Sequence, residues 1–435
     1  MTAATPPATP PATAPTTAPT TGFARDTAVL ASGLVLSQLL MLAVMPLWTR
    51  QYGPEAFAAL GLWMSVVAVV SVLLLLRYDT CIVVARDDAE ARALLRLCQR
   101  LALVGGTLLA LLAWALPAPW LAVIGLQPLG PWLPAAVAGG ALASIFAARL
   151  AWANRQRAYL ATTRARVGLA AATVALGSLL GLSGVSAGLL WAQLAAGGLA
   201  LWLLRAPGAA LAPGALAAAA RQHQAAPRYL WPSALLDACT QQLPMWLAVL
   251  WFSAVEAGHF SLAWRVTAIP VLMLAAAAGA VFYQRFAALA SQPHQARRLL
   301  LRTWAGLALL GLLPVLVLAL WGAPLFAGLF GPQWAAAGTL AAVLAPMLWA
   351  MLVSSPTSGA LIALGLQKWA PLFGVAMLLY RPAALWVGAQ QGSLALGLAL
   401  WAACEVVAIV LYNLLLLREL RTLRALHAQR QPDAA

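Results

Sequence analysis

The chain has 435 residues, of which 63% are apolar and only 9% are charged. A water-facing surface needs about a quarter of its residues charged, so this composition excludes an ordinary soluble protein and indicates a polytopic membrane protein. The formal charge of +15 comes from basic residues spread in small groups between apolar segments. That spread sets membrane topology and argues against nucleic acid as a partner.

The chain begins with a segment, residues 1–22, that is nearly all Thr, Ala and Pro. Such a composition can neither bury apolar surface nor hold a helix, so it predicts a disordered tail. The segment lacks the basic region and apolar core of a signal peptide. Membrane insertion is therefore expected to rely on the first apolar segment itself.

The hydropathy pattern then predicts twelve spanning helices, because a helix needs about 20 apolar residues to cross a bilayer. The fifth and sixth are the weakest, since only residues 183–186 separate them, and the pair could form a re-entrant element instead. The expected ranges are 27–49, 56–85, 99–119, 133–153, 167–184, 186–204, 231–252, 258–283, 303–321, 335–365, 370–390 and 394–417.

The basic residues between these spans predict the orientation. With the N-terminus in the cytoplasm, most of the 26 basic residues fall on the cytoplasmic side, and the opposite loops hold only Arg50. Under the positive-inside rule this asymmetry places both termini in the cytoplasm.

The two halves of the chain are expected to form two six-helix lobes, residues 23–204 and 231–417. A cytoplasmic linker, 205–230, joins them, and a basic cytoplasmic tail, 418–435, follows. A shift of 201 residues superposes Glu55 on Glu256 and Trp63 on Trp264. An even number of spans in each half implies repeats of the same orientation, related by an axis along the membrane normal.

Seven ionisable side chains are expected inside spans. An ionisable group at bilayer depth costs about 2.5–3.5 kcal/mol on insertion scales, so it normally faces a bundle interior or a water-filled cavity. The planar guanidinium of arginine suits phosphate and keeps its proton, which predicts binding of an anionic headgroup by the four arginines. The carboxylates are candidates for charge pairing or ion coupling. The predicted substrate-binding residues are Arg77, Arg149, Arg265 and Arg381, and the predicted acids are Asp79, Asp237 and Glu405.

Purely structural roles are the alternative. Arg77 and Asp79 lie on different helix faces, and each could pair with a neighbouring helix and only stabilise the fold. Arg149 and Arg265 lie near span ends, where their side chains could extend to the membrane interface. Arg381, in the middle of the eleventh span, is least easily explained in this way.

Other chemistry finds little support. The chain has no Gly-rich phosphate loop, and neither its four His nor its four Cys have the spacing of metal ligands. No catalytic residue, metal or cofactor is therefore expected. Buried charges in a membrane-spanning helical bundle are typical of a transporter.

Several motifs resemble one transporter family. A Y-x-P-E-x-F motif at 52–57 precedes the triplet Arg77-Tyr78-Asp79 and an acidic stretch at 87–90; further matches lie at 261–274 and 329–338. On these motifs the chain, from Phe23 to about Leu420, resembles polysaccharide-biosynthesis flippases of the Wzx type. Their superfamily also holds the multidrug and toxin extrusion exporters and the lipid II flippase.

The resemblance implies two six-helix lobes around a central cavity in the bacterial inner membrane. It implies export of an undecaprenyl-diphosphate-linked oligosaccharide from the cytoplasmic to the periplasmic leaflet by alternating access, for O-antigen of lipopolysaccharide, capsule or exopolysaccharide. The partners would be this anionic lipid, the bilayer, and the polysaccharide polymerase with its chain-length machinery. An H⁺ or Na⁺ gradient or the membrane potential could drive the step.

Two rival functions differ in what they require. A cation-coupled multidrug exporter of the same fold should present an acidic cavity to cationic compounds. A membrane polymerase or ligase of glycans would want a large outer loop carrying catalytic residues, and the outer loops here are short.

Overall fold

The computed structural model describes residues 20–205, 212–289, 292–364, 366 and 370–430. Within these ranges the chain is helical and contains no β-strand. Most of the predicted disordered tail, Lys368 and the last five residues of the predicted basic tail lie outside the described residues.

The first lobe comprises six spans, two of which are broken into a long and a short helix. Its helices are α1 (Thr20–Ala43), α2 (Met45–Gln51), α3 (Pro54–Leu75), α4 (Tyr78–Val84), α5 (Asp88–Ala115), α6 (Ala118–Val123), η1 (Gly130–Trp132), α7 (Leu133–Arg155), α8 (Tyr159–Leu182) and α9 (Gly188–Leu203). The linker follows as α10 (Ala215–Gln222) and the π-helical turn η2 (Ala226–Leu230).

In the second lobe the corresponding first two spans, α11 (Trp231–Trp251) and α12 (Ala254–Ala288), are each one continuous helix. Its other helices are α13 (Pro293–Phe330), η3 (Pro332–Trp334), α14 (Ala335–Ser354), η4 (Ser355–Thr357), α15 (Gly359–Ala363), α16 (Ala370–Gln390) and α17 (Leu394–Arg430). The expected boundary between the lobe and a basic tail, after residue 417, falls inside the continuous helix α17.

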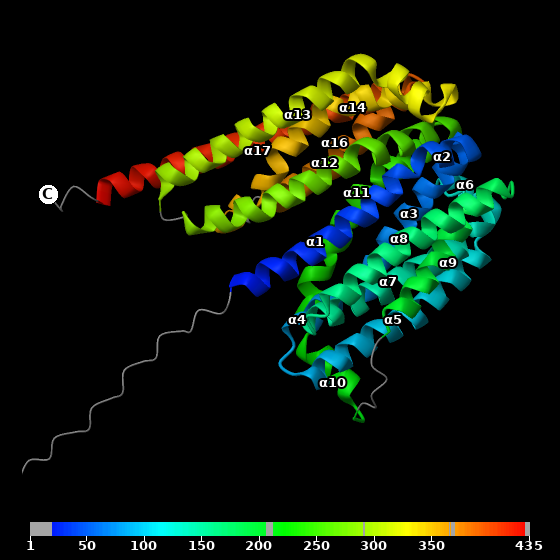
Figure 1. Cartoon of the computed structure of the whole chain (residues 1–435), viewed down its shortest axis with the longest axis horizontal. Helices are drawn as coiled ribbons and strands as arrows, with labels where there is room; N and C mark the ends of the chain where they lie inside the picture. Colours follow the sequence, from blue (N-terminus) through cyan, green and yellow to red (C-terminus); the bar gives the residue numbers. More distant parts are fainter. Residues whose placement is uncertain (1–19, 206–211, 290–291, 365, 367–369, 431–435) are drawn as a thin grey trace, which may run out of the picture.

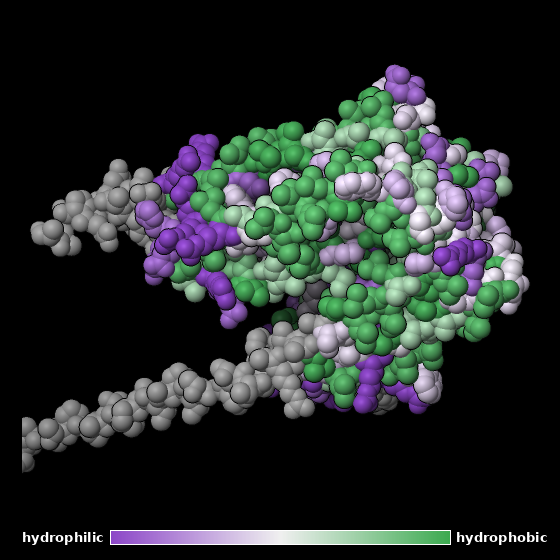
Figure 2. All heavy atoms as spheres, turned by 45° about the horizontal axis from the view of Figure 1, so that its top comes forward, coloured by the Kyte–Doolittle hydropathy of each residue, from purple (hydrophilic) through white to green (hydrophobic). Residues whose placement is uncertain are grey.

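Ten helical segments in the described part of the chain are long and apolar enough to cross a membrane. The shorter apolar helix α9 and the helix α11 pack among them. Helices α8 and α9 are two separate helices packed side by side. The prediction of an all-α membrane protein with about twelve spans in two lobes is confirmed. Hydrophobic residues cover much of the visible surface, and hydrophilic ones gather toward its ends (Figure 2).

Corresponding helices of the two lobes begin at nearly equivalent positions of the repeat. Helix α3 begins at Pro54 and α12 at Ala254, and each has a glutamate in its first turn, where negative charge suits the helix dipole. Ser253 and Glu256 form a complete capping box at the start of α12. Helices α7 and α14 begin at Leu133 and Ala335. Local signals therefore set equivalent helices in register across the two lobes.

The lobes meet tightly at one end, which we call the closed end. There the indole Nε1 of Trp334 donates to the carbonyl oxygen of Thr49 at 3.0 Å, and Trp334 packs edge to face on Phe57. A methyl group added at Gly258 would overlap the backbone carbonyl of Pro54, so only glycine allows α12 to approach α3 this closely. The two lobes are therefore in direct backbone contact at this point.

The opposite end, which we call the open end, carries α4, α10 and the last turns of α17, whereas α2 and α6 lie at the closed end (Figure 1). The space-filling view shows a hollow between the two lobes (Figure 2). The molecule is therefore two helical lobes joined at one end and separated toward the other.

Candidate functional site

Two cavities lie between the lobes. The first cavity, about 290 Å³, is enclosed by α1, α2, α3, α8, α9 and α12. The second cavity, about 360 Å³, is enclosed by α3, α11, α12 and α17. Three residues, Met64, Arg265 and Ile269, line both. The two cavities therefore meet at the α3–α12 contact, the axis of the repeat.

Arg265 on α12 is the charged group at this junction. Its only side-chain hydrogen bond to a described residue is a long one, 3.5 Å from Nη2 to the carbonyl oxygen of Leu60. It forms no ion pair with any residue that the structure describes. Under the shift of 201 residues its counterpart is Met64, so one of two equivalent positions carries a charge. Of the four predicted substrate-binding arginines, Arg265 alone lines a cavity between the lobes.

Arg166 is a second cationic group that lines the first cavity. Its Nε atom is buried and has no hydrogen-bond partner among the described residues. The expected fifth span, 167–184, left Arg166 in the cytoplasmic loop before it. Helix α8 begins at Tyr159, so Arg166 lies two turns inside the helix. The helix could have been predicted to begin before Val167, because the residues from Tyr159 continue it; Arg166 would then have been placed inside a helix.

Among the residues that the structure describes, neutral polar groups and no carboxylate complete the lining of the two cavities. The first cavity has amide and hydroxyl groups at Ser37, Gln38, Thr173 and Gln193. The second has them at Ser65, Gln241, Gln242 and Ser261, with aromatic rings at Phe260, Trp264 and Trp401. The combined space is thus cationic and rich in hydrogen-bonding groups, which suits an anionic, hydroxyl-bearing ligand.

Arg381 and Glu405 form a buried ion pair behind the second cavity. Both side chains are about 5% exposed, and two hydrogen bonds join them, from Nη2 at 2.9 Å and from Nε at 3.2 Å. Arg381 also donates to the carbonyl oxygen of Thr240 at 3.0 Å. Glu405 accepts further bonds from the Tyr380 hydroxyl at 2.8 Å and from the Trp401 indole at 2.9 Å. Neither charged group lines either cavity.

Arg149 serves a helix end. Its Nη1 atom donates to the backbone carbonyls of Leu201 and, at 3.1 Å, of Leu204, where α9 ends. The last carbonyls of a helix lack partners within the helix and form the negative end of its dipole. The structure thus gives Arg149 a capping contact on α9, and no position on either cavity.

The expectation that Arg77 and Asp79 lie within one long helix was wrong. Helix α3 ends at Leu75, and Leu76 and Arg77 follow in the left-handed conformation, with φ of 48° and 63°. The helix cannot continue through two such residues, and α4 begins afresh at Tyr78. No ion pair joins the Arg77 and Asp79 side chains in the described structure. Each retains a buried polar atom without a partner, Arg77 Nε and Asp79 Oδ1.

Asp237 differs from its predicted setting. It was expected as a buried charge, but its side chain on α11 is exposed. Helix α11 packs on α3 of the first lobe as well as on α16, so it runs between the lobes. The reason for the error is that an apolar run does not tell which face of a helix borders an open space.

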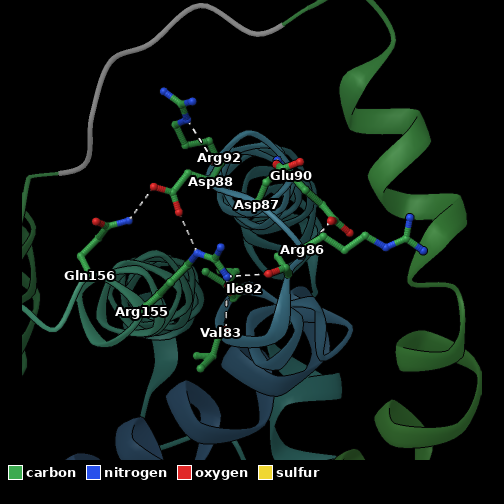
Figure 3. A network of polar contacts seen from close by, with 10 residues as sticks. Ile82, Val83, Arg86, Asp87, Asp88, Glu90, Arg92, Arg155 and Gln156 are labelled. Carbon is green, nitrogen blue, oxygen red and sulfur yellow. Dashed lines mark hydrogen bonds and ion pairs between the residues drawn. The ribbon is translucent and has the colours of Figure 1, made fainter. Parts of the chain in front are cut away.

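The acidic stretch after α4 has a structural part in the open end (Figure 3). The Arg155 guanidinium bonds the Asp88 carboxylate at 3.0 Å and the carbonyl of Ala85 at 2.7 Å, which ties α7 to the turn between α4 and α5. Glu90 accepts from Gln222 and contacts the His223 ring, both at 2.6 Å. These bonds fasten α10 of the linker to the first lobe.

Comparison with known proteins identifies relatives of this architecture. The model of a family described as polysaccharide biosynthesis protein matches residues 47–339, from α2 into α14. A search of curated proteins finds no significant match.

Solved transporters share the fold at low sequence identity. The lipid II flippase MurJ in an inward closed conformation has a TM-score of 0.70 and 10% identity, with 93% of each chain covered. An inward-facing multidrug resistance transporter of the MATE family has a TM-score of 0.64 and 15% identity, with 89% of this chain and 96% of that chain covered. A MOP superfamily transporter from Pyrococcus furiosus has a TM-score of 0.53 and 15% identity, with 92% and 96% covered.

Proposed function

Because the chain belongs to the family of polysaccharide biosynthesis proteins, we propose that it is a lipid-linked oligosaccharide flippase of the bacterial inner membrane. Its cargo would be an undecaprenyl-diphosphate-linked oligosaccharide, moved from the cytoplasmic to the periplasmic leaflet by alternating access. The product would feed the synthesis of O-antigen, capsule or exopolysaccharide.

The observation that supports this proposal is the charge of the space between the lobes. Arg265 and Arg166 line the first cavity, and no carboxylate is among its described lining residues. A diphosphate would supply the missing negative charge, and its oxygens match the planar donors of a guanidinium. Gln38 and Gln193 add neutral donors in the same cavity.

The positive-inside rule makes the open end cytoplasmic, because the loops at the closed end hold only Arg50. The space between the lobes would then receive its lipid from the cytoplasmic leaflet, and export would require the closed end to part. An inside-negative potential favours outward movement of an anion by about 2.3 kcal/mol per charge per 100 mV. Coupling to H⁺ or Na⁺ would need a carboxylate other than the paired Glu405, which leaves Asp79 and Asp237 as candidates.

The decisive experiment is binding of undecaprenyl-diphosphate-linked sugar to purified protein in detergent, compared among wild type, Arg265→Ala, Arg265→Lys and Arg100→Ala. A charge-assisted hydrogen bond is worth roughly 1.5–3 kcal/mol, so Arg265→Ala should weaken binding by about ten- to a hundredfold. The lysine variant keeps the charge and loses the planar fork, so its loss should be partial. Arg100→Ala removes an exposed arginine of α5 that lines neither cavity, so this control should bind as wild type does.

Thermal melting of each variant separates loss of binding from loss of folding. Unchanged affinity in well-folded Arg265→Ala and Arg166→Ala proteins would refute a cationic binding site. Efflux of cationic dyes from vesicles tests the rival function, a drug exporter. We expect no such efflux, because neither cavity has an acidic side chain among its described lining residues.

A further inference from the structure

We propose that the second cavity is a sugar subsite, in which the first sugar of the glycan stacks on Trp264 while the diphosphate lies at Arg265. This inference rests on the proposed function and adds the part of the substrate that the second cavity recognises. The cavity has a volume of about 360 Å³, at the lower end of the range of small-ligand sites, about 300–1,000 Å³.

The two cavities differ in chemistry. Beyond the shared Arg265, the first cavity contains another guanidinium, at Arg166, whereas the second contains no further charge. Both cavities have two glutamine amides, but only the second also has aromatic rings, among them Trp264. An amide both donates and accepts hydrogen bonds, as sugar hydroxyls do, and an aromatic ring offers an apolar face to the C–H side of a sugar ring. The second cavity therefore suits a neutral sugar better than a phosphate.

The ring of Trp264 is held in place from behind. It stacks on Trp401, with centroids 5.6 Å apart and an interplanar angle of 29°. Trp401 is only 2% exposed, and its indole N–H bonds the Glu405 carboxylate at 2.9 Å. Arg381 fixes that carboxylate with two hydrogen bonds. The buried ion pair thus orients the two indoles, and Arg381 and Glu405 are positioning residues that act through Trp401.

The repeat shows that this aromatic wall is not a requirement of the fold. The counterpart of Trp264 is Trp63, which is 2% exposed and packs on α7 beside Gly139. In the first lobe the tryptophan therefore belongs to the core, and in the second lobe it is half-buried and lines a cavity. The next residue differs as well: Met64 in the first lobe corresponds to Arg265 in the second. A charge beside a cavity-lining aromatic ring therefore occurs at this position of the second lobe and not at its counterpart in the first.

The experiment compares two probes, undecaprenyl diphosphate and the same lipid carrying one N-acetylhexosamine, on protein in detergent. Wild type should bind the sugar-bearing lipid more tightly. Trp264→Leu, which keeps apolar volume and loses the ring, should weaken the sugar-bearing lipid by about 3- to 10-fold and leave undecaprenyl diphosphate unchanged. Trp264→Phe should keep part of the preference. The matched control is Trp114→Leu, at a tryptophan that is 79% exposed and lies outside the second cavity. It should change the affinity for neither lipid.

The orienting role of the ion pair has its own readout. Trp401→Phe keeps a ring for stacking and loses the bond to Glu405, so it should reduce the sugar preference without changing affinity for undecaprenyl diphosphate. Equal effects of Trp264→Leu on both probes, or none on either, would overturn the sugar subsite, as would equal binding of both probes by wild type. If Arg265→Ala and Arg166→Ala also leave both affinities unchanged, the cationic site that supports the proposed function fails. A loss of both affinities in Arg265→Ala, with no sugar preference in wild type, removes only the subsite.

Discussion

Arg381 and Glu405 show how a buried ion pair is satisfied within one lobe. Among the described residues, every hydrogen-bond partner of the pair comes from α11, α16 or α17, and none from the first lobe. Removing one partner of such a pair leaves an uncompensated buried charge and typically costs about 3–5 kcal/mol. The pair is therefore a stability element of the second lobe before it is anything else.

We expect Glu405→Gln to lower the free energy of unfolding by about 3–5 kcal/mol, because it strands the Arg381 guanidinium at its buried site. The double variant Arg381→Met with Glu405→Gln should lose less than the sum of the two single changes. Thermal unfolding in detergent measures the series. Asp88→Asn is the matched control: it breaks an exposed ion pair with Arg155 and should cost far less. Additive losses in the double variant would contradict the coupling.

At the scale of secondary-structure elements, the break between α3 and α4 is a strained turn held in place by tertiary contacts. Two consecutive residues other than glycine adopt positive φ there, which costs roughly 1–2 kcal/mol for each. The turn is held from outside: the hydroxyl of Tyr78 reaches the carbonyl of Ala220 on α10, and Arg155 bonds the carbonyl of Ala85 after α4. Strain held in place by surrounding contacts is typical of segments that change conformation.

Comparison of Arg77→Gly with Arg77→Ala tests this backbone directly. Both variants lack the guanidinium, but glycine adopts a positive φ without cost. Arg77→Gly should therefore be the more stable of the two by about 1 kcal/mol in thermal unfolding. Equal stability, or a more stable alanine variant, would show that residue 77 is not left-handed in the protein. A transport defect shared by both would assign a role to the guanidinium itself.

At the scale of the whole molecule, the fold followed from the sequence because the bilayer fixes the length of an apolar run. The same rule misjudged where helices end: α8 begins at Tyr159 and α13 at Pro293, well before their apolar runs, and Arg166 was lost for that reason. Water-exposed turns extend a helix beyond the bilayer without any hydropathy signal.

The candidate site was harder to foresee because it depends on tertiary contacts. Arg381 and Glu405 lie on adjacent helices, and their sequence gives no sign that they neutralise each other. The left-handed Leu76 and Arg77 carry no glycine that would announce a break. Arg265 was found from its residue type alone, but its place at the junction of two cavities, opposite Met64, required the packing of α3 on α12.

Orientation in the membrane is the last property of the whole molecule that the charge distribution predicts. The linker helix α10 and the end of α17 lie at the open end, whereas the turn at Gly53, between α2 and α3, lies at the closed end (Figure 1). Under the positive-inside rule, fusions after Arg221 and after Arg424 should give active cytoplasmic reporters, such as a fluorescent protein, and inactive periplasmic phosphatase. A fusion after Gly53 should give the reverse pattern and serves as the control. An active phosphatase after Arg221 or Arg424 would show that the protein has the opposite orientation. The open cavities would then face the periplasm, in a state that releases lipid instead of loading it.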